Sequence, residues 1–190
     1  IAAEMAGISV LRLISEPTAA AIAYGIDDKQ KGNFIVYDLG GGTFDVSILT
    51  IKQGVFKVLS TKGDTHLGGD DIDELISEYL SEKYYKTESL SKRELIDISK
   101  KIKHKLFEND IAIEERYNIK LTIDELNNII NPLITKTLQI VNEAIQDSSL
   151  EEKDIDNIIL VGGSSRLRLI KKLLQKKYNI DLLSSLNPDT

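Results

Sequence analysis

The chain has 190 residues, of which 42% are hydrophobic and 28% are charged, so it can bury a core and form one domain or one large lobe of a bigger domain. Its net charge of −6 and its pI near 5.1 argue against a nucleic-acid partner. The sequence contains no cysteine, which excludes a disulfide scaffold and a thiolate metal site, and it has no apolar run of about 18 residues that would span a membrane.

The sequence begins as an excised piece would, inside a helix. Ile1–Gly7 has helical character and stops at a glycine, and no charged-then-apolar leader precedes it. A short strand is predicted at Val10–Ile14. Pro17 then opens an alanine-rich helix that runs through Tyr24, since proline favours the first helical turn. The last residues, 187–190, read as an unfinished Asn-Pro turn.

A glycine turn, Asp38–Asp45, is the most informative segment of the chain. It follows the apolar run Phe34–Val36 and leads into a strand from Val46 to Ile51. Its three successive glycines let the backbone approach a ligand closely, and successive backbone N–H groups form a concave anion site. The hydroxyl of Thr43 and the two flanking carboxylates could serve a phosphate-bound Mg²⁺. A hairpin without a ligand would explain the glycines, but it explains these flanking side chains less well.

Strand and helix patterns alternate after the turn. Val55–Ser60 alternates as a third strand, and Gly63–Gly69 is a loop. Asp70–Tyr85 and Ser89–Phe107 repeat apolar residues with a period of about 3.6, which predicts two helices. Asp110–Leu121 then predicts a short, charged strand–turn–strand.

A capping box marks the start of the next helix, because Thr122 and Glu125 can each satisfy an N–H group at the helix end. This helix runs to about Gln146, and Pro132 would break or kink it. The order of elements predicts a mixed α/β core with a mostly helical insertion at roughly Gly68–Asp147. No spacing of His, Asp or Glu suggests a zinc site.

A second glycine turn follows the apolar strand Asp156–Val161. Gly162 and Gly163 are followed by hydroxyl residues and by an amphipathic helix at Leu167–Lys177. The N-terminus of that helix directs N–H groups and a positive dipole at whatever fills the turn. Most Gly-Gly-Ser loops are structural. Two glycine turns in one chain would suit a nucleotide, with phosphates on one turn and base or ribose on the other.

Four motifs occur together and in order, at residues 14–25, 38–45, 63–71 and 161–166. Together they closely resemble the ATPase domain of the DnaK-type chaperones, the heat-shock protein 70 family, over essentially the whole chain. The resemblance implies an α/β, actin-like (ribonuclease-H-like) ATPase fold whose two lobes close on ATP. In that family the first lobe's own phosphate loop and catalytic lysine precede the segment that this chain matches.

The resemblance also implies a division of the chain. Residues 1–31 would be the last strand and helix of the first lobe. Residues 32–67 and 148–190 would form the mixed-sheet core of the second lobe, which carries the phosphate and adenosine loops. Residues 68–147 would be an inserted helical subdomain with a short hairpin.

Single residues receive roles from the same resemblance. The catalytic residues would be Asp38, Glu16 and Thr43. The nucleotide, ATP or ADP, would contact Gly40, Gly41, Gly42, Thr43, Gly69, Lys103, Gly162, Gly163, Ser164, Arg166 and Asp189. Mg²⁺ would be held through waters by Asp38, Glu16 and Asp45. Asp45 and Asp189 could equally be turn or cap carboxylates.

The helix that closes over adenine departs from the family pattern Glu-x-x-Lys-Arg-x-x-Ser. Lys103 matches, whereas Lys100, His104 and Phe107 replace the Glu, Arg and Ser. Fewer polar contacts to the adenosine and weaker nucleotide binding are therefore expected. Except for Lys103, this basic run could instead be a solvated helix face.

The lengths of two segments of the chain indicate a branch of the family. The stretch from Phe107 to Thr122 and the helical region before it are shorter than in general-purpose members, and both resemble the HscA branch, the chaperones of iron–sulfur cluster assembly. A general DnaK-type chaperone is the alternative, and a sugar kinase or actin-like ATPase of the same superfamily is a more remote one. A bacterial cytoplasm, or an organellar matrix, would be the location.

The resemblance implies that the parent protein hydrolyses ATP to ADP and phosphate. Its partners would be the first lobe and peptide-binding domain of the same chain, a J-domain co-chaperone, and a client protein or iron–sulfur scaffold, with no nucleic acid or membrane. By itself this chain holds half a cleft. We expect it to bind nucleotide weakly and to be inactive or nearly so, because positioning supplies most of the rate in such reactions.

Overall fold

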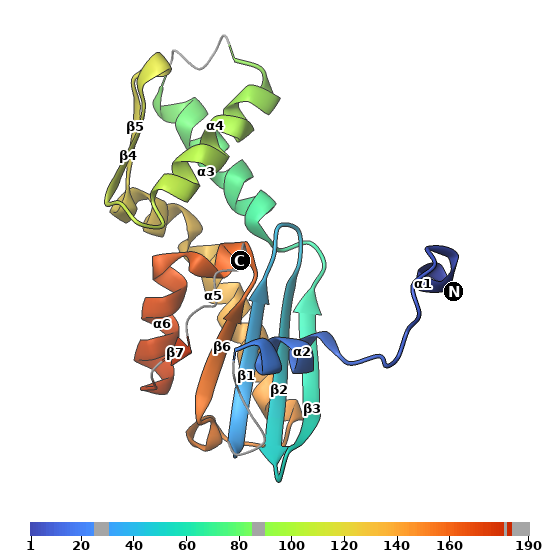
Figure 1. Ribbon diagram of the computed structural model, residues 1–190. Helices are drawn as coiled ribbons and strands as arrows, with labels where there is room; N and C mark the ends of the chain where they lie inside the picture. Colours follow the sequence, from blue (N-terminus) through green and yellow to red (C-terminus); the bar gives the residue numbers. More distant parts are fainter. Residues whose placement is uncertain (25–30, 85–89, 181, 184–190) are drawn as a thin grey trace.

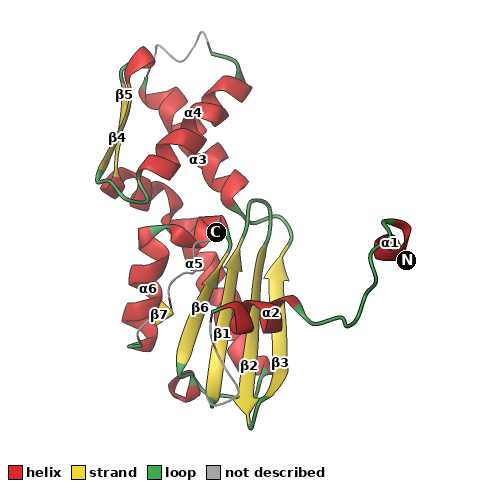
Figure 2. Ribbon diagram, viewed as in Figure 1, coloured by secondary structure: helices red, strands yellow, loops and turns green. Residues whose placement is uncertain are grey.

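The computed structural model describes residues 1–24, 31–84, 90–180 and 182–183. Within these residues a five-stranded sheet has the order β3-β2-β1-β6-β7 (Figures 1 and 2). Its strands are β1 (Gly32–Leu39), β2 (Phe44–Lys52), β3 (Val55–Asp64), β6 (Asn157–Val161) and β7 (Leu182–Leu183). The pairs β1–β2 and β2–β3 are antiparallel, whereas β6 runs parallel to β1 and β7 parallel to β6. The sheet is therefore mixed, as predicted.

Strand β1 is buried on both faces, which explains its nearly continuous apolar sequence. Ile35, Tyr37 and Leu39 point into the larger core, beneath helix α5 (Ile123–Asp147). Phe34 and Val36 point to the other face, where Ala21 of helix α2 (Glu16–Ala23) covers them. In Figure 1, α2 crosses one face of the sheet and α5 passes behind the other.

A helical region rises from one end of the sheet (Figure 2). It consists of α3 (Gly69–Lys83), α4 (Lys92–Lys105) and the hairpin β4 (Ile111–Glu114) and β5 (Ile119–Thr122). Helices α3 and α4 pack against each other; the apolar stripe predicted for α4 is buried, and the one predicted for α3 is buried or partly buried. Helix α6 (Arg168–Tyr178) follows β6 and buries Ile170 and Leu174 against the larger core.

Most predicted helix boundaries agree with the structure. The Thr122–Glu125 capping box is present, with the hydroxyl of Thr122 accepting from the N–H of Glu125 at 3.3 Å. Helix α5 continues through Pro132, so of the two predicted effects, a break or a kink, the break does not occur. Helix α1 (Ala2–Met5) ends just before Gly7, whose φ of +73° suits a glycine stop.

The strand predicted at Val10–Ile14 is absent, and this segment is an extended, exposed connection between α1 and α2 (Figure 1). A strand needs a neighbour to satisfy its backbone hydrogen bonds, and no described strand lies beside these residues. The loop predicted at Gly63–Gly69 is also shorter, because β3 continues through Asp64. Within the described ranges, every helix is too short or too polar to cross a bilayer.

Candidate functional site

The two glycine turns meet at one edge of the sheet because β1 and β6 are parallel neighbours, with Asp38 in register with Val161. Gly162 brings them into contact. A Cβ built at Gly162 would lie 2.4 Å from the carbonyl oxygen of Leu39 and 2.6 Å from Oδ1 of Asp38, and its φ is +83°. Only glycine fits both this conformation and this distance without strain.

The start of helix α3 packs onto the first glycine turn. The N–H of Gly69 donates to the carbonyl of Gly40 at 2.9 Å, and the N–H of Asp70 donates to the carbonyl of Gly41 at 2.7 Å. The first donors of α3 are therefore used to fix the turn. Among the described residues none accepts from the N–H groups of Gly41 or Gly42. These two donors remain available for an anion, which is the chemistry predicted for the turn.

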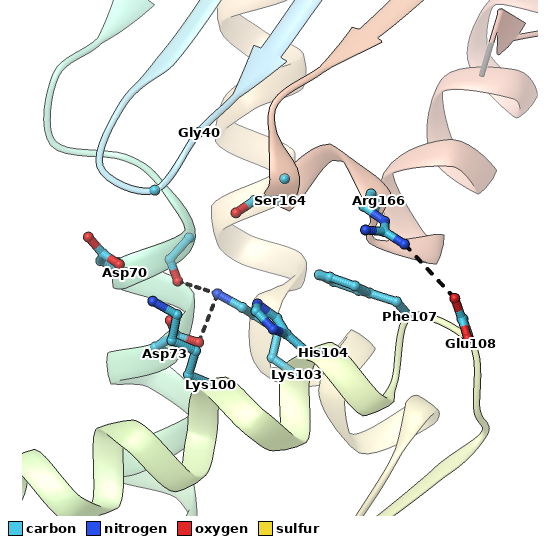
Figure 3. A pocket seen from close by; sticks show the side chains of 13 residues that line it. Gly40, Asp70, Asp73, Lys100, Lys103, His104, Phe107, Glu108, Ser164 and Arg166 are labelled. Atoms are coloured by element: carbon cyan, nitrogen blue, oxygen red, sulfur yellow. Dashed lines mark hydrogen bonds and ion pairs between the residues drawn. The ribbon is translucent and has the colours of Figure 1, made fainter. Parts of the chain in front are cut away.

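A cavity of about 490 Å³ lies between the two turns and helix α4, and Figure 3 shows the side chains that line it. This volume is in the range of small-molecule sites. The lining residues are Gly40, Gly41, Gly69, Asp70, Asp73, Lys100, Lys103, His104, Phe107, Glu108, Gly163, Ser164 and Arg166. The cavity is thus built by four separate segments, the two turns and the facing sides of α3 and α4.

Lys103 and Asp73 form a buried ion pair beside this cavity. Nζ of Lys103 lies 2.8 Å from Oδ1 of Asp73, and the two side chains are 4% and 2% exposed. The ammonium also donates to the carbonyl of Gly69 at 2.8 Å. Burial raises the pKa of Asp73, and the hydrogen bond and charge of Lys103 oppose that rise. An ammonium has three donors, so one N–H of Lys103 is left for a ligand.

An aromatic and cationic stack forms the opposite end of the cavity (Figure 3). The ring centroids of His104 and Phe107 are 5.3 Å apart, with an interplanar angle of 29°. The guanidinium carbon of Arg166 lies 5.6 Å from the centroid of Phe107. Nη2 of Arg166 is also 3.9 Å from Oε1 of Glu108. Burial and the neighbouring charge of Lys103 lower the pKa of His104, which favours a neutral ring.

The three predicted metal-site carboxylates face a second cavity, of about 380 Å³, between α2 and the sheet. Glu16, Asp38 and Asp45 all line it. Asp38 is half-buried; burial first, and then the negative charges of Glu16 and Asp45, raise its pKa to about 6. The described residues contain no cluster of three or more His, Cys, Asp or Glu placed to ligate a metal directly. The binding of Mg²⁺ through waters at these three carboxylates therefore stays a prediction.

The comparisons with known proteins identify the family. The whole chain, residues 1–190, matches the family model described as Hsp70 protein. The chain belongs to the Hsp70 family. It therefore has the mixed α/β architecture of the actin-like Hsp70 ATPase domain, a family that binds nucleotide.

Among its relatives are proteins described as "Chaperone protein HscA homolog". The relative from Rickettsia prowazekii (strain Madrid E) is 46% identical over 194 residues, covering 100% of this chain and 31% of the relative. The relative from Histophilus somni (strain 129Pt) is 44% identical over 193 residues, covering 99% of this chain and 31% of the relative. The chain thus spans about a third of the length of these relatives. This likeness supports the HscA branch that the loop lengths predicted.

The cavity gathers most of the nucleotide contacts predicted for this Hsp70 chain. Seven of the eleven predicted residues line it: Gly40, Gly41, Gly69, Lys103, Gly163, Ser164 and Arg166. Gly42 and Thr43 lie at the exposed tip of the turn, and Gly162 lies behind it against Asp38. Asp189 falls outside the described residues. The three carboxylates Glu16, Asp38 and Asp45 are not among its lining residues and face the separate cavity between α2 and the sheet.

Sequence reasoning missed Asp73, Asp70 and Glu108 as lining residues. A signal for Asp73 was present in the sequence. It lies three residues before Ile76, on the apolar face of α3, where an unpaired carboxylate would be costly. The basic run of α4 was left open as a solvated face. Lys100 and His104 are exposed but line the cavity, whereas Lys101 is exposed and is not among its lining residues.

Proposed function

We propose that this chain is the second lobe of an Hsp70 ATPase domain and holds ATP or ADP between its two glycine turns. In this proposal residues 1–31 belong to the first lobe, residues 32–67 and 148–190 form the sheet core, and residues 68–147 form an inserted helical subdomain. The observation that carries the proposal is the single cavity lined by Gly40, Gly69, Lys103 and Arg166, which come from both turns, α3 and α4.

The features of the cavity suit a nucleotide in one orientation. The unbonded N–H groups of Gly41 and Gly42 suit the phosphates, because they combine directed donors with close backbone approach. The third N–H of Lys103 suits a hydroxyl or phosphate oxygen in the middle. The face of Phe107 and the guanidinium of Arg166 suit a base at the other end.

The carboxylates suit Mg²⁺. This hard cation keeps several waters and takes few direct carboxylate ligands, and Glu16, Asp38 and Asp45 face one cavity without forming a closed ligand set. Burial, and then the negative charges of Glu16 and Asp45, raise the pKa of Asp38, and a cation bound nearby would oppose that rise. When bound with ATP, Mg²⁺ supplies charge neutralisation at the phosphate oxygens.

The chain's own contribution to hydrolysis is positioning. The turn donors hold the phosphate oxygens, and the hydroxyl of Thr43 adds a further polar contact at the tip. Asp38 orients the attacking water, and Glu16, which lines the same cavity, helps to fix the water network. No covalent nucleophile takes part. In this proposal the 190 residues by themselves bind nucleotide weakly and hydrolyse it very slowly, because the groups of the first lobe lie outside the segment that they match.

The whole protein is proposed to be an ATP-driven chaperone. Its ATPase cycle would switch a peptide-binding domain of the same parent chain between loose and tight grip, with a J-domain co-chaperone as partner. The relatives named as HscA homologues support a client or scaffold of iron–sulfur cluster assembly. A general DnaK-type chaperone remains the alternative. Binding of the full-length protein to an iron–sulfur scaffold, compared with binding to unfolded model substrates, separates the two.

Titration calorimetry with Mg·ADP and Mg·ATP tests the nucleotide site directly. We expect the full-length protein to bind both, and the 190-residue chain to bind them at least tenfold more weakly. Replacing Lys103 with Ala is expected to weaken binding in both, whereas replacing the exposed Lys101 of the same helix is not. If the full-length protein binds neither nucleotide, the proposed function is wrong. If the 190-residue chain turns over ATP as fast as the full-length protein, the proposal that it holds only half of the nucleotide cleft is wrong.

A further inference from the structure

The position of the Glu16 carboxylate depends on where helix α2 lies. Glu16 is the first residue of α2 and is exposed, and among the described residues its side chain has no hydrogen-bond or ion-pair partner. It nevertheless lines the cavity between α2 and the sheet together with Asp38, and its charge helps to raise the pKa of Asp38. Because no side-chain contact fixes Glu16, the separation of the two carboxylates follows from the placement of the helix.

Small apolar side chains attach α2 to the sheet. Ala21 is completely buried and packs in the same cluster as Phe34 and Val36 of β1, with Ala20 at its margin. The segment before the helix, residues 8–15, is exposed, and no described strand lies beside it. Alanine buries little area, so packing of this kind holds a helix against the sheet without fixing how far it slides or turns.

Tyr24 supplies a directed contact at the other end of α2. The helix ends at this residue, and its hydroxyl donates a hydrogen bond to the backbone carbonyl of Leu160 in β6. Leu160 lies one residue before Val161, which is the register partner of Asp38. Burial, and then the charge of Asp38, raise the pKa of Tyr24, so the hydroxyl remains a donor at neutral pH. The hydrogen bond therefore joins α2 to the strand beside Asp38.

A contact at one end of a short helix also controls the other end. Glu16 and Tyr24 are separated by about 12 Å along the helix axis, at 1.5 Å per residue. Figure 1 shows α2 crossing the face of the sheet between these ends. A shift or rotation of the helix at Tyr24 would move the carboxylate of Glu16 relative to that of Asp38. A misplacement of about 1 Å at a reacting centre can cost about 10²-fold in rate.

We propose that Tyr24 is a positioning residue for ATP hydrolysis, and that its hydrogen bond to Leu160 holds Glu16 where it can help Asp38 to order the attacking water. The proposal rests on the proposed function of this site and on the role of Glu16 in it. Tyr24 is not among the lining residues of either site cavity, so it acts through α2. Nucleotide binding depends on the glycine turns and is independent of this hydrogen bond.

The test is single-turnover hydrolysis of Mg·ATP by the full-length protein and its Tyr24→Phe variant. Phenylalanine keeps the ring that packs beside Ala21 and removes only the hydroxyl, so the variant is expected to fold. We expect its hydrolysis rate to fall by about three- to tenfold, as for the loss of one hydrogen bond. The dissociation constant of Mg·ADP, measured by titration calorimetry, should change by less than about twofold.

Tyr178→Phe is the matched control. The hydroxyl of Tyr178 donates to Oδ1 of Asn142 at 3.4 Å and so also joins two separate segments, α6 and α5. Tyr178 lines neither site cavity. The control variant should hydrolyse ATP at the rate of the natural protein.

A double-mutant cycle with Glu16→Gln separates positioning from a general loss of structure. Glu16→Gln by itself should slow hydrolysis, because it removes the charge that α2 places. Adding Tyr24→Phe should then lower the rate by less than about twofold, because the carboxylate that the hydrogen bond positions is already absent. A purely structural effect of Tyr24 would instead be the same in both backgrounds. Urea denaturation of the four proteins measures any loss of stability independently.

Each outcome decides for or against the proposal. A slower hydrolysis step in Tyr24→Phe, with unchanged Mg·ADP binding and no comparable further loss in the Glu16→Gln background, supports it. An unchanged rate overturns it, as does an equal loss in both backgrounds or a parallel loss of Mg·ADP affinity. In these three cases the proposed nucleotide site still stands. If the natural full-length protein neither binds nor hydrolyses ATP, the proposed function fails and this proposal fails with it.

Discussion

The ammonium of Lys103 lies 2.8 Å from a carboxylate oxygen of Asp73, and both side chains are almost completely buried. The pair joins α4 to α3, and through the carbonyl of Gly69 it also reaches the start of α3. Because that start is bonded to the first glycine turn, the pair supports the wall of the candidate site as well as lining it.

Breaking this pair on one side is expected to be costly. Lys103→Met leaves the Asp73 carboxylate buried without its partner, and the free energy of unfolding should fall by about 3–5 kcal/mol. The measurement is urea denaturation of the nucleotide-free protein, followed by circular dichroism. Lys101→Met, at an exposed position of the same helix, should change stability by less than about 0.5 kcal/mol.

The double variant Asp73→Leu/Lys103→Met distinguishes the loss of the ion pair itself from the cost of leaving one charge buried without a partner. Replacing both partners with apolar residues removes the isolated charge, so stability should return to within about 1 kcal/mol of the natural protein. Nucleotide affinity should stay low, since the third N–H of the ammonium is still missing. Equal stability of the two Lys→Met variants, at positions 101 and 103, would show that the pair does not support the fold.

The second glycine turn offers a matched pair of substitutions. A Cβ at Gly162 would lie 2.4 Å from the carbonyl of Leu39, in a left-handed conformation with φ of +83°, whereas a Cβ at Gly163 meets no atom within 4 Å. Gly162→Ala should therefore lower the free energy of unfolding by about 2–4 kcal/mol, through strain and through displacement of Asp38. Gly163→Ala should cost less than about 1 kcal/mol. Thermal unfolding of the two variants side by side checks the difference, and similar melting temperatures would count against the contact.

Local sequence patterns were sufficient for most of the fold. The strand–glycine–strand order around Asp38 predicted the β1–β2 hairpin, and the apolar period of α4 predicted which of its residues are buried. The capping box at Thr122 marked the start of α5 to the residue. These features depend on neighbours within a few positions, so a single sequence contains them.

The rest depends on packing between distant segments. Val10–Ile14 has the composition of a strand, but no described strand lies beside it to accept its hydrogen bonds. The pairing of Asp73 with Lys103 joins residues on different helices, and only the α3–α4 packing brings them together. The carbonyls of Gly40 and Gly41 accept hydrogen bonds from the first N–H groups of α3, and these contacts also join separate segments of the chain. Sequence motifs could name the residues of the candidate site, but not the hydrogen bonds that fix its shape.

The ionisation of Glu125 should make the stability of the helical region depend on pH. Its carboxylate accepts hydrogen bonds from Lys83, from the Tyr79 hydroxyl at 2.8 Å and from the Thr122 N–H at 2.9 Å. The hydrogen bond from Lys83 is the largest cause, and together these contacts lower the pKa of Glu125 to about 2. A folded pKa below the unfolded value stabilises the protein above about pH 4.5, and this stabilisation is lost as the pH falls toward 2.

Replacing Glu125 with Gln should remove this contribution. The pair lies near the surface and is screened by water, so we expect the free energy of unfolding to fall by only about 1–2 kcal/mol at pH 7. The difference from the natural protein should shrink steadily below pH 4.5. Urea denaturation at pH 7, 4 and 3 checks this, with Glu82→Gln, at an exposed position of α3, as the control. A difference that is constant with pH would mean that the charge of Glu125 is not what stabilises the helix start.

The contribution of Asp38 to the free energy of unfolding should have the opposite pH dependence. Its pKa is raised to about 6, so the folded protein holds a proton more tightly than the unfolded chain does. The free energy of unfolding should therefore rise as the pH falls from 7 toward 4. Asp38→Asn should remove this slope and raise the stability of the nucleotide-free protein at pH 7. The expected gain is about 1–2 kcal/mol, below the full value of the shift because the carboxylate is only half-buried.

The same variant should damage function, because a carboxylate that destabilises the empty site is the group proposed to orient the attacking water. We expect ATP turnover by the full-length Asp38→Asn protein to fall about 10²-fold or more, while Mg·ADP binding falls much less. Saturating Mg·ADP should also flatten the pH slope of the natural protein, since a nearby cation favours the ionised carboxylate. Melting temperatures between pH 5 and 7, with and without Mg·ADP, measure this. A variant that is both less stable and fully active would contradict the account of Asp38.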